Sequence, residues 1–335
     1  MSEQNQVKSR PSELTAVLNR EFFEQPPEVC VSPQDINRWK SFRKKYHLAH
    51  ELKYRSDFPL QIDFELNSHC NMKCSFCTHG NETVPVKKMN FETFKKTIDE
   101  GEKHGLVSIK LNYINEPLLR SDIWDFIKYA RSKGILNIYF STNGTKLTES
   151  NSIKLIESGV SKIMVSLDAV TPETFRLMRH SERFEEIIEN VERFIRIRNS
   201  MGKTNPLLRV NFVKTDLNIH ESDTFITFWK DKADALGFQD LVSVPGVKNK
   251  NTKPHKRNFR CSFPFKLSVV DVNGDVLPCC TFSGREMPIG AVRSTEANIK
   301  TAWESKRRQD LINLHERGGY EENPICKHCI NSGGV

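Results

Sequence analysis

Apolar and polar residues alternate along most of the chain in a repeated order of strand and helix. Residues 60–66, LQIDFEL, place an apolar side chain at every second position, as a half-buried strand does. Residues 90–105 follow with Phe91, Phe94 and Ile98 on one helical face. The pattern therefore predicts a strand, a loop rich in polar residues and then an amphipathic helix.

The same order continues to about residue 245. We expect further strands at 107–112, 136–142, 162–167, 207–213 and 239–244, and helices at 121–134, 148–159, from 171 to about 199, and 220–236. Strands that alternate with helices predict a parallel sheet with right-handed crossovers. The expected class is α/β, as a partial (β/α)6 TIM-type barrel, whose ligands would gather at the carboxyl ends of the strands.

The alternation ends after about residue 245, and a different pattern follows. Asn273-Gly274 lies between two alternating segments and is the favoured two-residue turn of a β-hairpin. We expect one helix over 296–317 after it. The chain is thus divided into a charged, helical N-terminal lead-in (1–55), a core barrel (56–245) and a small β-hairpin plus helix domain (246–335).

Composition is that of an ordinary globular protein, with 37% hydrophobic and 27% charged residues among 335. No apolar run approaches the roughly 20 residues that span a bilayer, and residues 1–30 have no signal-peptide core. We therefore expect a cytoplasmic protein without membrane contact. The net charge of +8 favours an anionic substrate or an acidic partner, and no RNA- or DNA-binding fingerprint accompanies it.

One local concentration of positive charge lies in residues 248–257. It is either a solvated linker or a binding site for the phosphate of an activated sugar. In the second interpretation, the phosphate would bind to the basic residues Lys248, Lys250, Lys253, Lys256 and Arg257.

Eight of the nine cysteines fall into three groups, and Cys30, which stands alone, is expected to be a small buried apolar residue. In a reducing compartment such groups indicate metal rather than disulfides. Cys70, Cys74 and Cys77 follow the first expected strand with the spacing C-x3-C-x2-C. They form either a zinc site completed by His69 or His79, or a [4Fe-4S] site in which one iron has no protein ligand.

This spacing, directly after the first strand of a barrel, resembles the signature of the radical S-adenosylmethionine (radical SAM) superfamily. The resemblance implies that Phe76 lies against the adenine of SAM and that Asn115, Glu116 and Pro117, in place of the family's GEP motif, hold its amino group. Asn115 departs from the family glycine.

Two later segments extend the resemblance. STNG, with Ser141 and Asn143, is similar to the segment that contacts the ribose and methionine end of SAM. SLDAVTPETFRLMR is similar to a stretch in which Ser166 and an arginine hold the SAM carboxylate. Arg179 is the better match and Arg176 the competing one, and Asp168 belongs to the same expected SAM site.

The resemblance implies that SAM binds the open iron and is cleaved reductively to methionine and a 5′-deoxyadenosyl radical, which abstracts hydrogen from a substrate carbon. It also implies a flavodoxin or ferredoxin as electron donor.

The C-terminal cysteines Cys261, Cys279, Cys326 and Cys329 resemble the SPASM auxiliary-cluster domain or its shortened twitch form. The chain has no further cysteines for a second auxiliary cluster, so we expect one auxiliary [4Fe-4S] cluster with four thiolates. A zinc ribbon that uses the same four thiolates is the alternative.

Cys280 remains. It is a replacement for Cys279 as a ligand, a small core residue, or a thiol that donates hydrogen to a substrate radical. The favoured function is oxidation or epimerisation of a carbohydrate-like substrate, such as a nucleotide- or phosphate-linked sugar or a cyclitol. A maturase that modifies a ribosomal precursor peptide is the second interpretation, and a zinc-binding interaction protein without enzymatic activity is the third.

Overall fold

The computed structural model describes residues 22–81, 83–241, 259–294 and 296–331. The basic run with Lys248, Lys250, Lys253, Lys256 and Arg257 lies outside the described residues, as do residues 1–21 of the expected lead-in.

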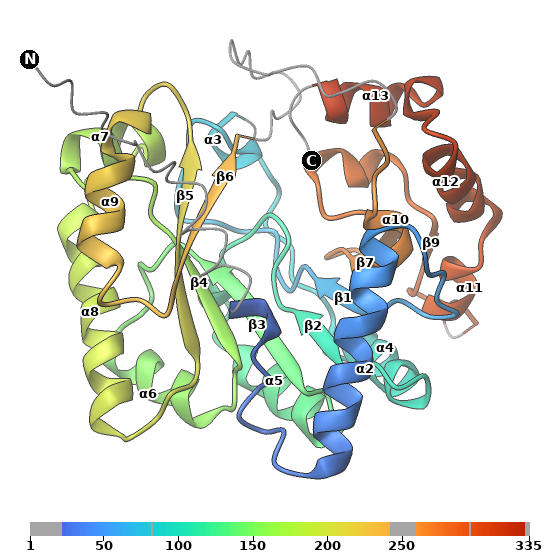
Figure 1. The fold of residues 1–335 in the computed structure, drawn as a ribbon, viewed down its shortest axis with the longest axis horizontal. Coiled ribbons are helices and arrows are strands. Elements are labelled where there is room, and N and C mark those ends of the chain that lie inside the picture. Colours follow the sequence, from blue (N-terminus) through green and yellow to red (C-terminus); the bar gives the residue numbers. More distant parts are fainter. Residues whose placement is uncertain (1–21, 82, 242–258, 295, 332–335) are drawn as a thin grey trace, which may run out of the picture.

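One twisted sheet forms the centre of the molecule, with the strand order β6-β5-β4-β3-β2-β1-β7-β8-β9 (Figure 1). The first six strands are parallel and form the expected partial barrel, which stays open. Their bounds are β1 Gln61–Phe64, β2 Ser108–Lys110, β3 Asn137–Thr142, β4 Lys162–Ser166, β5 Leu207–Lys214 and β6 Ala235–Asp240.

Helices cover the outer face of this sheet, and apolar residues join the two layers. These helices are α4 Phe91–Lys103, α5 Ile123–Ser132, α6 Glu149–Glu157, α7 Pro172–Arg179, α8 Phe184–Ser200 and α9 Ser222–Trp229. Phe64 of β1 meets Phe94 of α4 edge to face, with ring centroids 4.7 Å apart, and Phe126 of α5 lies 4.9 Å from Phe94. The amphipathic periodicity of the sequence thus marks the buried faces correctly.

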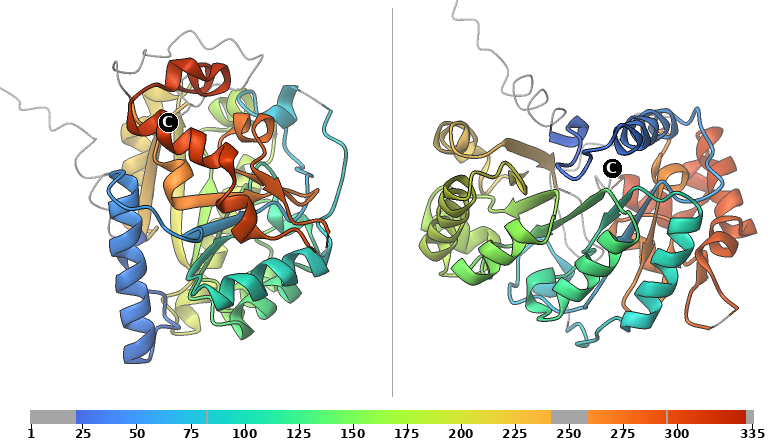
Figure 2. Two further views of the ribbon diagram at one scale, coloured as in Figure 1. Left: turned by 90° about the vertical axis from the view of Figure 1, so that its right-hand side faces the viewer. Right: turned by 90° about the horizontal axis from the view of Figure 1, so that it is seen from below.

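The described part of the N-terminal lead-in contains one long helix. Helix α2 (Pro33–His50) begins after Ser32, whose side chain accepts a hydrogen bond from the Asp35 N–H. It lies on the opposite side of the sheet from α4 and α5 (Figure 2). Trp39 and Phe42 pack there against Val107 and Leu136, so the lead-in closes the inner side of the barrel.

The small C-terminal region continues the same sheet. Strand β7 (Leu267–Val270) pairs parallel with β1, and β8 (Asp275–Leu277) and β9 (Gly290–Ala291) follow antiparallel. Short helices surround them: α10 Phe263–Lys266, α11 Ile299–Trp303, α12 Lys306–Glu316 and α13 Pro324–Asn331. Helix α3 (Thr78–Asn81) lies beside the carboxyl end of β6, whereas α13 lies above α12 at the upper right of Figure 1.

Two expected helices are each divided in two. The helix expected from 171 to 199 ends at Arg179, because His180 has a left-handed backbone with φ 49°, and a second helix starts at Phe184. The helix expected over 296–317 is broken at Ser305, which accepts a hydrogen bond from the Arg308 N–H and so begins α12. Periodicity continues through both breaks, so it did not reveal them.

The last barrel strand was placed four residues too late, at 239–244. The structure has β6 at Ala235–Asp240, and the helix expected at 220–236 ends at Trp229. Phe238 pairs in register with Phe212 and packs on Phe225, and this aromatic group fixes the strand.

The hairpin was expected at the right place, but its turn differs. A two-residue turn of the favoured type needs positive φ at both residues. Gly274 has φ 81°, whereas Asn273 is not among the residues with positive φ. The Gly274 N–H donates to the Asp271 carbonyl, so the turn spans Asp271 to Gly274.

Candidate active site and metal centres

The loop after β1 carries the first three cysteines and is tied down by its neighbours. The Cys77 N–H donates to the Cys74 carbonyl, and the Ser75 N–H donates to the Met178 carbonyl of α7. His79 donates from Nε2 to the Ile114 carbonyl at 2.7 Å, which ties the cysteine loop to the segment after β2. His69 lies in the same loop and is exposed. A Cβ at Gly80 would collide with the Cys74 carbonyl, so only glycine permits this tight loop.

The three thiols lie in a poorly solvated environment. Burial raises the pKa of Cys70 to about 12 and also raises that of Cys77. Thiolates here need a positive charge beside them, which iron supplies. A set of three cysteines with low solvent access fits a four-iron cluster.

Arg179 lies directly against this loop. Its Nη1 donates to Cys74 Sγ at 3.3 Å, and its guanidinium lies over the ring of Phe76, 5.3 Å from the centroid. It also forms a buried ion pair with Asp168, whose backbone has φ 65° and whose Oδ1 accepts from the Val213 N–H. Arg176, the competing candidate, pairs with exposed Glu182 instead. Of the two arginines, Arg179 is the one at the cysteine loop.

Glu116 ties the segment after β2 to the segment after β3. Its carboxylate accepts from the Thr142 hydroxyl at 2.8 Å, the Asn143 N–H at 2.6 Å and the Leu118 N–H at 3.1 Å. Burial raises its pKa to about 7. The expected SAM-binding segments, Asn115 to Pro117 and Ser141 to Gly144, are therefore held as one unit, with Glu116 as its internal anchor.

Asn143 joins this unit to the cysteine loop. Its Nδ2 donates to Asn71 Oδ1 at 2.8 Å and lies 3.9 Å from Cys70 Sγ. Ser141 and Ser166 are partly buried at the carboxyl ends of β3 and β4. The expected SAM-site residues therefore lie at one end of the sheet. The sequence did not single out Asn71 or Thr142, whose polar side chains next to the motifs were the available signal.

The second group of cysteines surrounds one cavity in the C-terminal region. Its lining includes Cys261, Cys279, Cys326 and Cys329 together with Thr281 and His315. Burial raises the pKa of all four thiols, that of Cys326 to about 12 and that of Cys329 to about 11. This set of four cysteines fits a closed four-iron cluster. Within the described ranges, no three His, Cys, Asp or Glu side chains lie close enough to ligate one metal ion.

Two side chains that the sequence did not single out touch these thiols. The Thr281 hydroxyl lies 3.4 Å from Cys279 Sγ and 3.8 Å from Cys329 Sγ. His315 is buried, and its Nε2 lies 3.7 Å from Cys326 Sγ. Its Nδ1 accepts a hydrogen bond from the Cys261 N–H at 3.4 Å, and burial lowers its pKa to about 4.

Cys280 faces away from this cavity. It packs beside Tyr113, Leu267 and Val269, on the inner side of the barrel. Burial raises its pKa to about 12, Asp63 raises it further and Lys110 lowers it. Of the two adjacent cysteines, Cys279 is thus the one that joins the auxiliary set.

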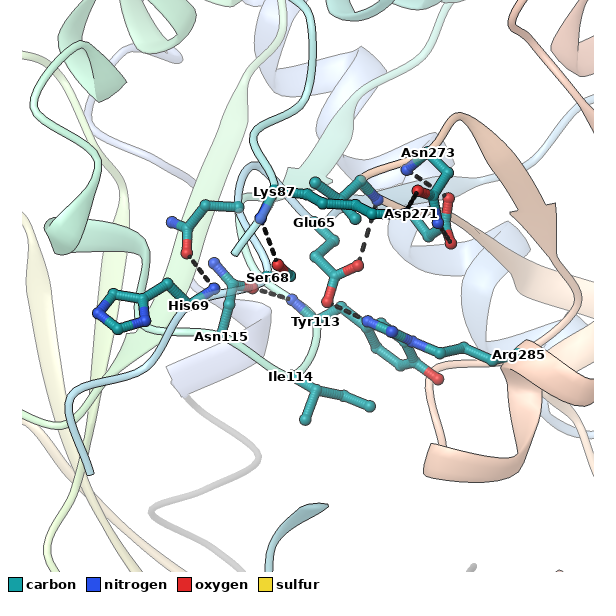
Figure 3. A network of polar contacts seen from close by, with 12 residues as sticks. Glu65, Ser68, His69, Lys87, Tyr113, Ile114, Asn115, Asp271, Asn273 and Arg285 are labelled. Carbon is teal, nitrogen blue, oxygen red and sulfur yellow. Dashed lines mark hydrogen bonds and ion pairs between the residues drawn. The ribbon is translucent and has the colours of Figure 1, made fainter. Parts of the chain in front are cut away.

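A polar network links the barrel to the C-terminal region (Figure 3). Glu65, at the end of β1, pairs with Arg285 and accepts from the Val272 N–H at 3.2 Å. The Arg285 guanidinium lies over the Tyr113 ring, and the Tyr113 hydroxyl donates to the Thr281 carbonyl. The loop that carries Cys279 and Cys280 is therefore fixed against the end of the barrel.

Two family models match the chain. The model described as the radical SAM superfamily matches residues 64–208, and SPASM, described as an iron-sulfur cluster-binding domain, matches residues 261–330. The structure contains no helix among its described residues that is long and apolar enough to cross a membrane.

Curated relatives are similar over about half of the chain. The mycofactocin maturase MftC of Mycolicibacterium smegmatis is 26% identical over 182 residues, which are 53% of this chain and 43% of MftC. A probable GTP 3′,8-cyclase of Methanococcus maripaludis is 29% identical over 153 residues, which are 45% of this chain and 49% of the cyclase. The chain thus spans about half the length, or less, of these relatives.

Solved structures share the fold over more of the chain. SuiB of Streptococcus suis bound to S-adenosylmethionine gives a TM-score of 0.63 at 16% identity and covers 97% of this chain and 84% of SuiB. BtrN in complex with AdoMet and 2-DOIA gives a TM-score of 0.55 at 20% identity and covers 80% of this chain and 92% of BtrN.

Proposed function

Because the chain belongs to the radical SAM superfamily and carries a SPASM-type iron-sulfur domain, we propose that it oxidises or epimerises a carbohydrate-like substrate. The family assignment implies a SAM-binding [4Fe-4S] cluster at Cys70, Cys74 and Cys77, together with an auxiliary cluster. We assign the auxiliary cluster to Cys261, Cys279, Cys326 and Cys329. The assignment supports an enzyme over a zinc-binding interaction protein.

The observation that carries the proposal is the opposite orientation of two adjacent cysteines. Cys279 lines the auxiliary cavity, whereas Cys280 faces Asp63 and Lys110 on the inner side of the barrel. The four cysteines around that cavity would hold the auxiliary cluster, which would supply an electron acceptor for a substrate radical in the barrel interior. A thiol on the interior side can instead return a hydrogen atom to that radical. Both outcomes start from one hydrogen abstraction.

SAM bound at the open cluster supplies the 5′-deoxyadenosyl radical. The chain's own residues position SAM and close the site. Arg179, held by Asp168 and stacked on Phe76, is placed to bind the SAM carboxylate. Glu116 fixes the two segments that would hold the amino group and ribose. Tyr113 and Arg285 hold the auxiliary loop against the barrel and thereby limit water entry.

The experiment is anaerobic reconstitution followed by incubation with SAM, dithionite and deuterated cyclitols or sugar phosphates. We expect deuterium to appear in 5′-deoxyadenosine with one of them. SAM cleavage without deuterium transfer from any of these compounds, but with transfer from a labelled peptide, would reject the carbohydrate assignment. A flavodoxin or ferredoxin is the proposed natural donor, and replacing dithionite with reduced flavodoxin tests it.

Peptide modification is the second candidate. MftC is a maturase by name, and SuiB has been solved with its precursor peptide SuiA at a TM-score of 0.58. A gene for a short precursor peptide beside this one would favour it, whereas genes for sugar nucleotidyl- and glycosyltransferases would favour the carbohydrate substrate.

A further inference from the structure

Arg209 of β5 is a buried cation, and no oxygen of the residues that the structure describes accepts a hydrogen bond from it. It is 7% exposed, and its neighbours Leu208 and Val210 pack into the outer core, so Arg209 faces the barrel interior. Its guanidinium lies over the Phe23 ring, 5.3 Å from the centroid, and its Nη1 lies 3.9 Å from the sulfur of Met164. Its Nε has no acceptor within the described ranges.

The other buried arginines of the described chain differ from Arg209 in this respect. Each of them donates to at least one oxygen. They are Arg120 with Asp122, Arg179 with Asp168, Arg198 with Asp234, and Arg308 with the carbonyls of Pro264 and Trp303. Phe23 and Met164 hold the Arg209 guanidinium in place but supply no negative charge. Leaving a buried charge uncompensated is costly, so the arrangement is unexplained by packing alone.

The neighbouring strand makes room for this side chain. A Cβ at Gly237 of β6 would collide with Nε and Nη2 of Arg209. Glycine inside a strand often marks a close approach of another group. Here the group is the guanidinium, which is seated against the β6 backbone with its Nε donor unused. Burial lowers the pKa of Arg209 to about 10, so the side chain is still a cation at neutral pH.

An unused acceptor lies on the same face of β5. Asn211 is buried, and its Oδ1 receives no hydrogen bond from any residue in the described part of the chain. In the register of the sheet, Asn211 is opposite Ser166 and Arg209 is opposite Met164. Ser166 belongs to the expected SAM site, so Arg209 lies one layer of side chains deeper in the barrel. A substrate that extends from the SAM site toward the amino end of β5 would reach Asn211 first and Arg209 next.

We propose that Arg209 binds an oxyanion of the substrate, a carboxylate or a phosphate, while Asn211 accepts a hydrogen bond from a hydroxyl or amide of the same molecule. This inference rests on the proposed function, because it takes the barrel interior as the substrate chamber. It narrows the substrate to an anionic molecule. Guanidinium groups suit this task because their N–H donors match two oxygens at once.

The test measures anion binding to the reconstituted holoenzyme by titration calorimetry, with inorganic phosphate and with acetate as separate probes. We expect saturable binding of one probe to the wild type. Arg209→Gln should weaken it at least about tenfold, because a charge-assisted pair is lost. Gly237→Ala should weaken it as well, since it displaces the guanidinium without removing its charge. Arg196→Gln, on the exposed face of α8, is the matched control and should bind as the wild type does.

The two probes separate the two sources of the oxyanion. Binding of phosphate alone indicates a phosphorylated substrate, and binding of acetate alone indicates a carboxylate. If Arg209→Gln does not fold, Arg209→Lys keeps the charge with a single donor group and should bind more weakly than the wild type. The proposal is overturned if the wild type binds neither probe, or if the Arg209 variants bind as tightly as Arg196→Gln.

A separate measurement keeps this proposal distinct from the proposed function. Formation of 5′-deoxyadenosine by the wild type with SAM and dithionite reports on the radical reaction alone. SAM cleavage without Arg209-dependent anion binding rejects the anion site and leaves the radical reaction intact. Arg209-dependent anion binding without SAM cleavage would reject the radical reaction and leave the anion site intact.

Discussion

His315 Nε2 lies 3.7 Å from Cys326 Sγ, while its Nδ1 accepts the Cys261 N–H. The second contact fixes the tautomer: Nδ1 carries no proton, so Nε2 carries one and points it at the thiol. An N–H donor to a thiolate ligand of a cluster favours the more negative, reduced state. If Cys326 ligates the proposed auxiliary cluster, His315 would be a positioning residue that raises the reduction potential of that cluster.

Substituting His315 should lower that potential. Asn at 315 can still accept from Cys261 but does not reach Cys326, whereas Gln extends an N–H donor to the position of Nε2. We expect His315→Asn to lower the midpoint by about 40 mV, from about 1 kcal/mol per hydrogen bond and about 59 mV per tenfold change. His315→Gln should stay near the wild type. Redox titration followed by electron paramagnetic resonance measures both, and equal midpoints in all three proteins would contradict the assignment.

The two cysteine sets should lose iron independently. Changing Cys70, Cys74 and Cys77 together to Ala should reduce the iron from about eight to about four per chain and abolish SAM cleavage. Changing Cys279 and Cys326 to Ala should also leave about four irons but keep some SAM cleavage. Iron and sulfide analysis with 5′-deoxyadenosine quantification checks both. Cys30→Ala, outside both sets, is the control.

Cys280→Ala should retain the iron of both sites, because Cys280 does not line the auxiliary cavity. If Cys280 returns hydrogen to the substrate radical, this variant should lose at least about tenfold of the deuterium that the product takes up from D2O. An oxidised product should accumulate instead. Mass spectrometry of the product measures this. Unchanged deuterium content in the variant would assign Cys280 to packing alone.

Asp168→Asn should destabilise the protein by about 3 kcal/mol, because it leaves Arg179 buried without its carboxylate. Asn tolerates the left-handed backbone at this position, so the change tests the charge rather than the turn. The exposed pair of Arg176 and Glu182 is the matched control, and Glu182→Gln should leave the stability close to that of the wild type. Urea unfolding measures the free energy of unfolding of both variants. Similar losses of that free energy would contradict the expectation that the buried pair stabilises the fold more than the exposed pair does.

Asp63 should make stability depend on pH. Burial raises its pKa to about 6, so the folded state binds this proton more tightly than the unfolded state does. Its stabilising contribution is full below about pH 4 and is lost as the pH rises through about 6. Between about pH 5 and pH 8, Asp63→Asn should therefore gain about 1 to 2 kcal/mol relative to the wild type. Thermal unfolding across this range measures the gain, and exposed Asp57→Asn should show none.

Sequence reasoning worked where periodic burial or motif chemistry decides the structure. The six barrel strands were all expected, and five lay close to their observed positions, because buried faces repeat along them. It placed the sixth strand too late, since Phe238 is fixed by contacts with Phe212 and Phe225 that no local pattern contains. The break at His180 was missed for a similar reason, as a single left-handed residue leaves little trace in the sequence.

The sequence motifs identified the two candidate sites. They did not identify the residues outside the motifs that contact those sites or lie near them. Cys70, Cys74 and Cys77 have a recognisable spacing, whereas His315 reaches Cys326 only because α12 and α13 are packed together. Arg209 likewise looks like an ordinary charge within a strand until the lack of an oxygen partner is seen in three dimensions. The spacing of cysteines in the sequence identifies candidate metal ligands. Buried polar atoms without a hydrogen-bond partner can be identified only from the folded structure.

The parallel pairing of β7 with β1 has a consequence for electron transfer. Strand β1 leads into Cys70, and β7 leads into the hairpin that carries Cys279, with Asp63 opposite Val269 and Phe64 opposite Val270. One hydrogen-bonded ladder thus joins the strand that leads to Cys70 with the strand that leads to the Cys279 hairpin. If the two cysteine sets hold the proposed clusters, the register of this ladder would fix the distance that an electron crosses between them. That distance would therefore be the same in every turnover.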